Sequence, residues 1–121
     1  MPNRGADGDR LRVRVEAGAA AAVLHLIGDL DFRTAEVLRR VVDARLAAGQ
    51  ARLVFDCTEL VFCDSSGLGV LVGAAKRANA QGGGVGLRAV PDHLRQVLIL
   101  TGLAKVLHID PAEQDPDSNG N

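Results

Sequence analysis

Short apolar segments suited to strands alternate with amphipathic segments suited to helices along most of this chain. Residues 52–56 read Arg-Leu-Val-Phe-Asp, a continuous apolar run that favours a central strand covered on both faces. Helix-type segments precede and follow this run. A chain that alternates in this way folds with right-handed crossovers and a largely parallel sheet. The alternation therefore predicts an α/β fold with a mostly parallel central sheet and helices packed on it.

Two strands begin the expected order, which is β-β-α-β-α-β-α-β. Residues 11–15 alternate apolar and charged side chains, and residues 22–27 form a more buried strand that closes at Gly28. Their hairpin adds an antiparallel N-terminal edge strand. A helix with Thr34 as its N-cap and Glu36 in its first turn then runs to about Gly49. Its apolar face comprises Ala35, Leu38, Val41, Val42 and Leu46.

The second half continues the alternation. A helix is expected from Ser65 or Ser66 to about Ala80, followed by a strand over residues 85–90. Pro91 and Asp92 open a third helix, and residues 106–109 form a last short strand. The predicted apolar faces are Leu68, Leu71, Val72, Ala75 and Ala78 in the second helix, and Leu94, Val97, Leu98 and Thr101 in the third.

With 121 residues, the chain has room for one domain. We expect a flexible segment over residues 1–10, the folded domain over 11–110 and a disordered acidic tail over 111–121. The N-terminal residues lack the apolar run of a signal peptide, and the longest apolar stretches are too short to cross a bilayer. These features predict a cytoplasmic protein with no membrane partner.

Composition argues against several function classes. A net charge of −1 and an aromatic content of 2% disfavour nucleic-acid binding, which needs basic surfaces or stacking platforms. Cys57 and Cys63 are not arranged as C-x-x-C, and no zinc-finger spacing accompanies them, so we expect buried reduced thiols. No metal, cofactor or catalytic residue is expected.

The polar junction over residues 63–69, Cys-Asp-Ser-Ser-Gly-Leu-Gly, stands where a buried strand gives way to a helix. It lacks the first glycine of a G-x-S-x-G nucleophile elbow, and its glycines do not fit a dinucleotide-binding loop or a P-loop. Asp64 or Ser65 can cap the helix, and the glycines can allow close packing of the helix on the sheet. Capping explains one polar residue but leaves two adjacent serines after an aspartate unexplained.

The junction closely resembles the D-S-S-G-L-G signature of STAS domains, in particular those of bacterial anti-sigma factor antagonists. Other segments extend the resemblance over about residues 11–110 in the expected order. They are Gly28-Asp29-Leu30-Asp31 with Thr34-Ala35, similar to the family's G-E-L-D…T-A, Leu53-Val54-Phe55-Asp56 with Leu60, and Leu100-Thr101-Gly102-Leu103. Asp29 stands where the family more often has Glu.

The resemblance implies a non-enzymatic protein that binds an anti-sigma factor, often a Ser/Thr protein kinase, and thereby frees a sigma factor. It implies that Ser65 is the phosphoacceptor, that phosphorylation ends binding, and that a phosphatase resets Ser65. The partner-binding residues that it implies are Asp31, Asp64, Ser65, Ser66 and Gly67. The alternative is a STAS scaffold or regulatory subunit of a sensory complex or a transport system that does not act on a sigma factor.

Overall fold

A six-stranded sheet forms the centre of the molecule, and its strands lie in chain order. The computed structural model describes residues 6–7 and 10–109. The first two strand pairs are antiparallel and the other three are parallel, which confirms the predicted mostly parallel sheet with an antiparallel N-terminal edge. The strands are β1 (Ala6–Asp7), β2 (Leu11–Ala17), β3 (Ala22–Leu30), β4 (Arg52–Cys63), β5 (Gly84–Arg88) and β6 (His108–Ile109).

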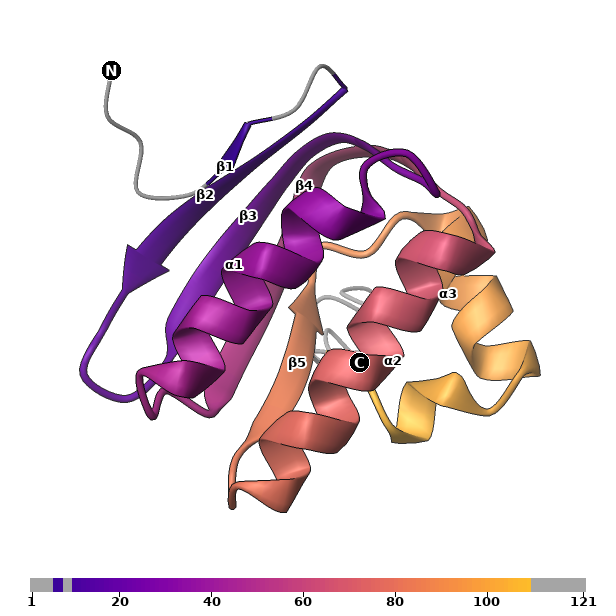
Figure 1. Ribbon diagram of the computed structural model, residues 1–121. Helices are drawn as coiled ribbons and strands as arrows, with labels where there is room; N and C mark the ends of the chain where they lie inside the picture. Colours follow the sequence, from indigo (N-terminus) through magenta and orange to yellow (C-terminus); the bar gives the residue numbers. More distant parts are fainter. Residues whose placement is uncertain (1–5, 8–9, 110–121) are drawn as a thin grey trace, which may run out of the picture.

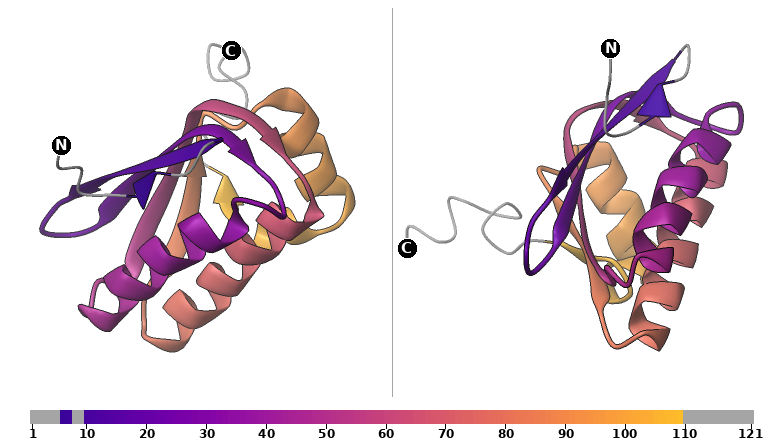
Figure 2. Two further views of the ribbon diagram at one scale, coloured as in Figure 1. Left: turned by 45° about the horizontal axis from the view of Figure 1, so that its top comes forward. Right: turned by 60° about the vertical axis from the view of Figure 1, so that its left-hand side comes forward.

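Helices cover one face of this sheet. Helices α1 (Ala35–Ala47) and α2 (Ser65–Ala80) lie side by side, and α3 (Asp92–Leu100) lies on the other side of α2 from α1 (Figures 1 and 2). A short 3₁₀ turn, η1 (Leu103–Lys105), follows α3. The apolar core fills the space between helices and sheet, with Phe55 of β4 fully buried at its centre. No helix formed by residues 10–109 lies over the opposite face of the sheet (Figure 2).

Helix burial follows the predicted periodicity closely in α1 and less closely in the others. All five residues expected on the apolar face of α1 are buried. In α2 the buried stripe includes Val70 and Ala74, whereas Leu68 and Val72 are half-buried. In α3 only Leu94 and Leu98 are buried, so the prediction that Val97 and Thr101 share that face was wrong. The contact stripe of this short helix is narrow because only one line of side chains reaches the core.

Several element boundaries differ from those expected. Strand β3 continues through Gly28, which pairs with Leu11 of β2 and Leu60 of β4 and adopts a φ of 109°. A Cβ atom there would lie 2.2 Å from the carbonyl oxygen of Arg10, so glycine permits this close approach rather than ending the strand. Strand β4 is also longer, because pairing with β3 carries it past the polar residues that follow Asp56. Strands β5 and β6 are shorter than predicted.

The N-terminal segment expected to be flexible contributes a strand, since Ala6–Asp7 pairs with Val13 and Arg12 of β2. The sequence did not predict this strand, because a two-residue edge strand is held by backbone hydrogen bonds and needs no alternation of apolar side chains. The predicted acidic tail over residues 111–121 lies outside the described residues.

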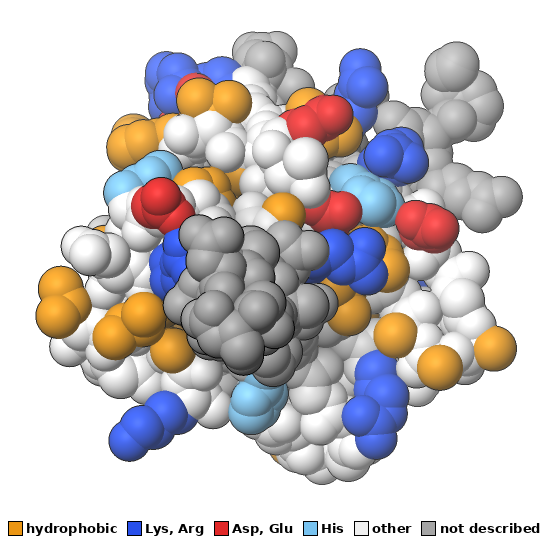
Figure 3. All heavy atoms as spheres, turned by 180° about the vertical axis from the view of Figure 1, so that it is seen from behind, with side chains coloured by type: hydrophobic (Ala, Val, Ile, Leu, Met, Phe, Trp, Pro, Cys, Tyr) orange, Lys and Arg blue, Asp and Glu red, His pale blue; other side chains and the backbone are white. Residues whose placement is uncertain are grey.

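A cluster of charged groups crosses the face of the sheet opposite helices α1 and α2, where charged and histidine side chains are interspersed with apolar ones (Figure 3). The His25 ring lies between two carboxylates, with Nε2 2.9 Å from Glu16 Oε1 and Nδ1 3.2 Å from Asp56 Oδ2. Arg88 Nη1 lies 3.7 Å from the same Asp56 oxygen. Carboxylates only accept hydrogen bonds, so a protonated His25 can donate to both neighbours. The cluster thus links four adjacent strands, β2 to β5.

Asp56 is expected to make the fold sensitive to acid. Burial opposes ionisation of this carboxyl group, but hydrogen bonds from Thr58 and the nearby charges of His25 and Arg88 outweigh it and lower its pKa. The unfolded chain, with an Asp pKa of about 3.9, therefore takes up this proton before the folded chain does. The ionised Asp56 therefore stabilises the fold fully above the unfolded-state pKa, and this stabilisation is lost as the pH falls through the lower folded-state pKa.

Urea unfolding between pH 6 and pH 3 measures this effect. The Asp56→Asn variant should lose less stability over this range than the wild-type chain. Asp43→Asn is the control, because Asp43 forms an exposed ion pair with Arg77 on the helical side, and it should retain the wild-type slope. An Asp56→Asn slope equal to that of the wild type would contradict the assignment.

Candidate functional site

The two connections that carry the predicted site lie at the same end of the sheet. Leu30, at the end of β3, pairs in parallel with Cys63, at the end of β4. Both strands then turn toward helices at the upper right of Figure 1, β3 into α1 and β4 into α2. The structure therefore brings the loop over residues 31–34 beside the junction over residues 64–67.

Asp64 joins these two connections through its carboxylate. One oxygen, Oδ1, accepts a hydrogen bond from the Gly67 backbone N–H at 3.0 Å, so Asp64 is the side-chain N-cap of α2. The other oxygen, Oδ2, accepts from the Phe32 backbone N–H at 3.1 Å. The capping role predicted for Asp64 or Ser65 thus belongs to Asp64, and the same side chain also holds the neighbouring loop.

Gly67 packs directly against the end of β3. A Cβ atom at this position would lie 2.5 Å from Leu30 Cγ and 2.7 Å from the Leu30 carbonyl oxygen. The Asp64 backbone N–H donates to that same oxygen at 3.1 Å. Glycine at position 67 therefore allows the first turn of α2 to sit against the sheet, as the alternative of close packing anticipated.

Ser65 and Ser66 are exposed in the first turn of α2. Backbone N–H groups in a first helical turn lack partners within the helix, and the helix dipole adds partial positive charge there. A phosphate group at such a position is electrostatically favourable for the folded chain. The junction can therefore accept a phosphoserine without unfolding.

Asp31 is mostly buried, with 5% of its surface exposed. Its carboxylate accepts from the backbone N–H groups of Arg33 and Thr34, at 2.9 and 3.2 Å, and from Arg10 Nη2 at 2.8 Å. Burial opposes its ionisation, but these hydrogen bonds and the Arg10 charge lower its pKa. Asp31 therefore shapes the loop that follows β3.

Thr34 occupies the N-cap position of α1 as predicted, but its side chain makes no capping hydrogen bond. The Thr34 hydroxyl instead donates to the carbonyl oxygen of Asp29 at 2.8 Å and accepts from the Asp31 backbone N–H at 2.9 Å. The prediction of side-chain capping by Thr34 was wrong because its hydroxyl bonds Asp29 and Asp31 in the preceding turn, and the Val37 N–H donates to the Thr34 carbonyl oxygen.

Most of the described chain matches known proteins in both sequence and fold. The family model described as "Mlab, STAS domain" matches residues 13–108. The chain belongs to the STAS domain family. The resemblance drawn from the D-S-S-G-L-G junction is thereby confirmed.

Relatives of this STAS domain include the anti-sigma F factor antagonist of Paenibacillus polymyxa, 31% identical over 100 residues, which cover 82% of this chain and 86% of the relative. A crystal structure of an anti-sigma factor antagonist from Mycobacterium paratuberculosis superposes with a TM-score of 0.76 and 26% identity, covering 94% of this chain and 97% of the other. The phosphorylated form of the Bacillus cell fate determinant SpoIIAA shares the fold, with a TM-score of 0.69, 24% identity and coverage of 89% and 99%.

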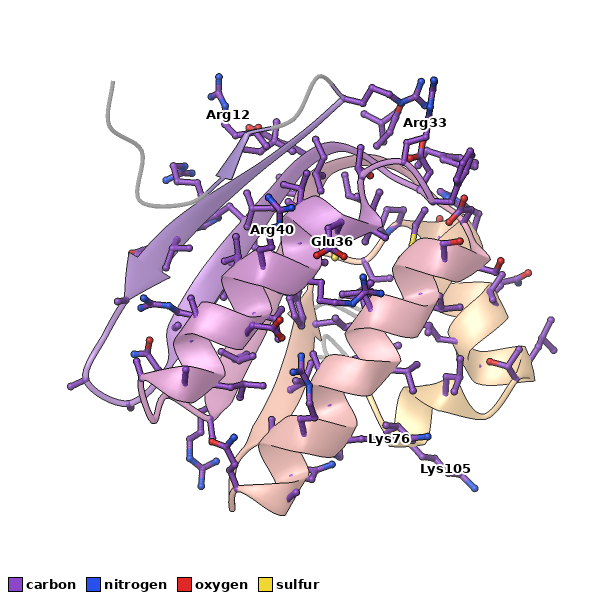
Figure 4. All side chains as sticks on the ribbon, viewed as in Figure 1. Arg12, Arg33, Glu36, Arg40, Lys76 and Lys105 are labelled. Carbon is purple, nitrogen blue, oxygen red and sulfur yellow. The ribbon has the colours of Figure 1, made fainter. Side chains whose placement is uncertain are left out.

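Sequence reasoning missed two residues of this STAS domain site. Arg10, assigned to the flexible N-terminal segment, bridges Asp29 and Asp31 through Nη2 at 3.1 and 2.8 Å. Phe32, counted only as one of three aromatic residues, is 73% exposed in the loop beside Asp64. Figure 4 shows Arg33 at the same end of the molecule, pointing outward. The only signal for Arg10 in the sequence was a cationic residue just before the strand predicted from residue 11, and that signal did not indicate its partners.

Both cysteine thiols of this STAS domain are free, with Cys57 buried and Cys63 half-buried. Burial raises the pKa of the Cys57 thiol to about 12 and that of Cys63 to about 11, so both are protonated at neutral pH. Residues 10–109 bring together no group of three or more metal-ligating side chains. An open hollow of about 480 Å³ lies at the opposite end of the sheet, around residues 48–52 and 81–83. No helix in the described part of the chain is long and apolar enough to span a bilayer.

Proposed function

We propose that this STAS domain is an anti-sigma factor antagonist, a binding regulator and not an enzyme, which acts in the cytoplasm. In its unmodified state it binds an anti-sigma factor and so releases a sigma factor. The anti-sigma factor is a Ser/Thr protein kinase that phosphorylates Ser65, and a phosphatase restores the serine. The observation that carries this proposal is the exposed Ser65 in the first turn of α2, beside the loop that Asp64 ties to it.

The proposed switch works because a phosphate on Ser65 costs little free energy in the free domain but much more at the interface with the partner. Phosphorylation adds about −1.5 to −2 charges at neutral pH. The amides and dipole of α2 accommodate this charge in the free domain. A partner packed over Ser65 meets added bulk, desolvation and repulsion from any acidic group of its own. Partner binding is lost while the fold is retained.

The proposed binding surface comprises Ser65, Ser66, the buried Gly67 beneath them, Asp64 and the loop that Asp31 shapes. Relatives named anti-sigma factor antagonists support the choice of partner. The matched domain covers most of these relatives, which favours the same kind of partner over a scaffold role within a larger assembly. Release of a bound sigma factor on addition of this chain separates the two roles.

Phosphorylation of Ser65 can be tested directly. Purified kinase-type anti-sigma factors of the source organism are incubated with this chain and ATP, and the modified residue is located by mass spectrometry. We expect one phosphate at Ser65 and essentially complete loss of labelling in Ser65→Ala. The matched control Ser66→Ala, one residue further along the same turn, should remain labelled. Undiminished labelling of Ser65→Ala would overturn the assignment.

A further inference from the structure

Two of the three aromatic residues of this chain are exposed at the ends of β3 and β4. Phe55 is fully buried in the core, whereas Phe32 is 73% exposed and Phe62, two residues before Asp64, is 48% exposed. A single exposed apolar side chain is common on protein surfaces. Phe32 differs from such residues because hydrogen bonds restrain the backbone of its loop.

Every backbone N–H group in the loop around Phe32 has an acceptor. Asp31 donates to Thr34 Oγ1, Phe32 to Asp64 Oδ2, Arg33 to Asp31 Oδ1, and Thr34 to the Asp31 carbonyl oxygen, at 2.9, 3.1, 2.9 and 3.1 Å. The loop is thus ordered before any partner arrives. An aromatic side chain on an ordered backbone loses little conformational entropy on binding, which is typical of residues that dominate interfaces.

The position of Phe32 is also fixed relative to Ser65. The Asp64 carboxylate accepts from Phe32 on one side and from Gly67, two residues after Ser65, on the other. Arg10 pairs with Asp29 and Asp31, so its positive charge offsets part of the negative charge of the two carboxylates that precede Phe32. The surface around Phe32 is therefore continuous with the Ser65 site and suits an apolar pocket.

We propose that Phe32 is the aromatic anchor of the docking surface and inserts into an apolar pocket of the anti-sigma factor. This inference rests on the proposed function, because it takes the partner that binds at Ser65 as the occupant. Asp64 is a positioning residue in this arrangement, since it holds the anchor and the phosphorylation site in one fixed geometry.

The purified anti-sigma factors of the source organism are first screened for binding to the wild-type chain. The affinity of the Phe32→Ala variant for the anti-sigma factor so identified is then measured. We expect a loss of roughly 10- to 100-fold, the range for truncation of an interfacial anchor. Leu100→Ala is the matched control, because Leu100 is 82% exposed on α3, and it should bind like the wild type. Urea midpoints of both variants should stay at the wild-type value.

Asp64→Asn tests the positioning role separately. The amide retains one oxygen for the cap of α2 but places a nitrogen where the Phe32 N–H needs an acceptor. We expect faster hydrogen exchange at the Phe32 amide and an affinity loss of roughly threefold to tenfold, smaller than for Phe32→Ala. Faster exchange with wild-type affinity would contradict the positioning role.

The remaining outcomes separate this inference from the proposed function. Wild-type affinity of Phe32→Ala, with binding still abolished by Ser65→Asp, would overturn the anchor and leave the proposed function standing. Absence of any binding by the wild-type chain, or equal affinities of Ser65→Ala and Ser65→Asp, would overturn the proposed function itself. A dimer in sedimentation that becomes a monomer in Phe32→Ala would assign the anchor to a second copy of this chain and overturn the proposal.

Discussion

The Ser65→Asp variant should bind the anti-sigma factor much more weakly than the wild-type chain, whereas Ser65→Ala should bind it constitutively. A carboxylate at position 65 lies in the first turn of α2, where the helix favours it, so the free domain remains folded. At the interface the same charge is desolvated and unpaired. We expect a penalty of about 2–4 kcal/mol, or roughly 30- to 1,000-fold in Kd.

Isothermal titration calorimetry with the purified anti-sigma factor measures this difference, alongside the enzymatically phosphorylated wild-type chain. Ser66→Asp is the matched control, with the same charge one residue further along, and it should weaken binding less. Urea unfolding should show Ser65→Asp at least as stable as the wild type. Equal affinities of Ser65→Ala and Ser65→Asp would argue against a charge-based switch.

The Gly67→Ala variant should be destabilised, whereas the same change at Gly69 should be stabilising. The added methyl group at position 67 would overlap the Leu30 side chain and its carbonyl oxygen, so α2 must move away from β3. Such overpacking should cost about 2–3 kcal/mol of unfolding free energy. Gly69 lies exposed in the same helix, with open space where a Cβ would be added, so alanine should add about 0.5–1 kcal/mol to the free energy of unfolding.

Chemical denaturation of the two variants checks both signs in one experiment. The pair is informative because both glycines lie in α2, where alanine is the better helix former, whereas the added Cβ meets Leu30 only at position 67. A Gly67→Ala variant as stable as Gly69→Ala would show that the first turn of α2 is not packed tightly on β3. The Asp64 cap would then be the main restraint on this turn.

Local periodicity was sufficient for much of the fold. The five buried residues of α1 were predicted from their spacing, and α2 runs from Ser65 to Ala80 as expected. Boundaries were less accurate where strand pairing overrides local pattern. Gly28 suggested an end to β3, yet the approach of Arg10 to its backbone makes it a position inside the strand.

The junction's motif was recognisable in the sequence, and so was the family. The hydrogen bonds around the junction could not be predicted from the sequence. Asp31 was expected as a partner-binding residue, and nothing in the sequence indicated that its carboxylate is occupied by Arg10, Arg33 and Thr34. These bonds depend on how the chain turns after β3, which a motif does not encode residue by residue.

The order of strand-type and helix-type segments determined the parallel α/β architecture, because local periodicity indicates each segment. The D-S-S-G-L-G junction determined the family, because its motif consists of contiguous residues. Only the tertiary structure decided that Phe32 lies exposed beside Asp64 and that Asp64 holds both connections. Phe32 and Asp64 are 32 positions apart in the chain. Parallel pairing of β3 with β4 brings them together, and that contact is a property of the folded sheet.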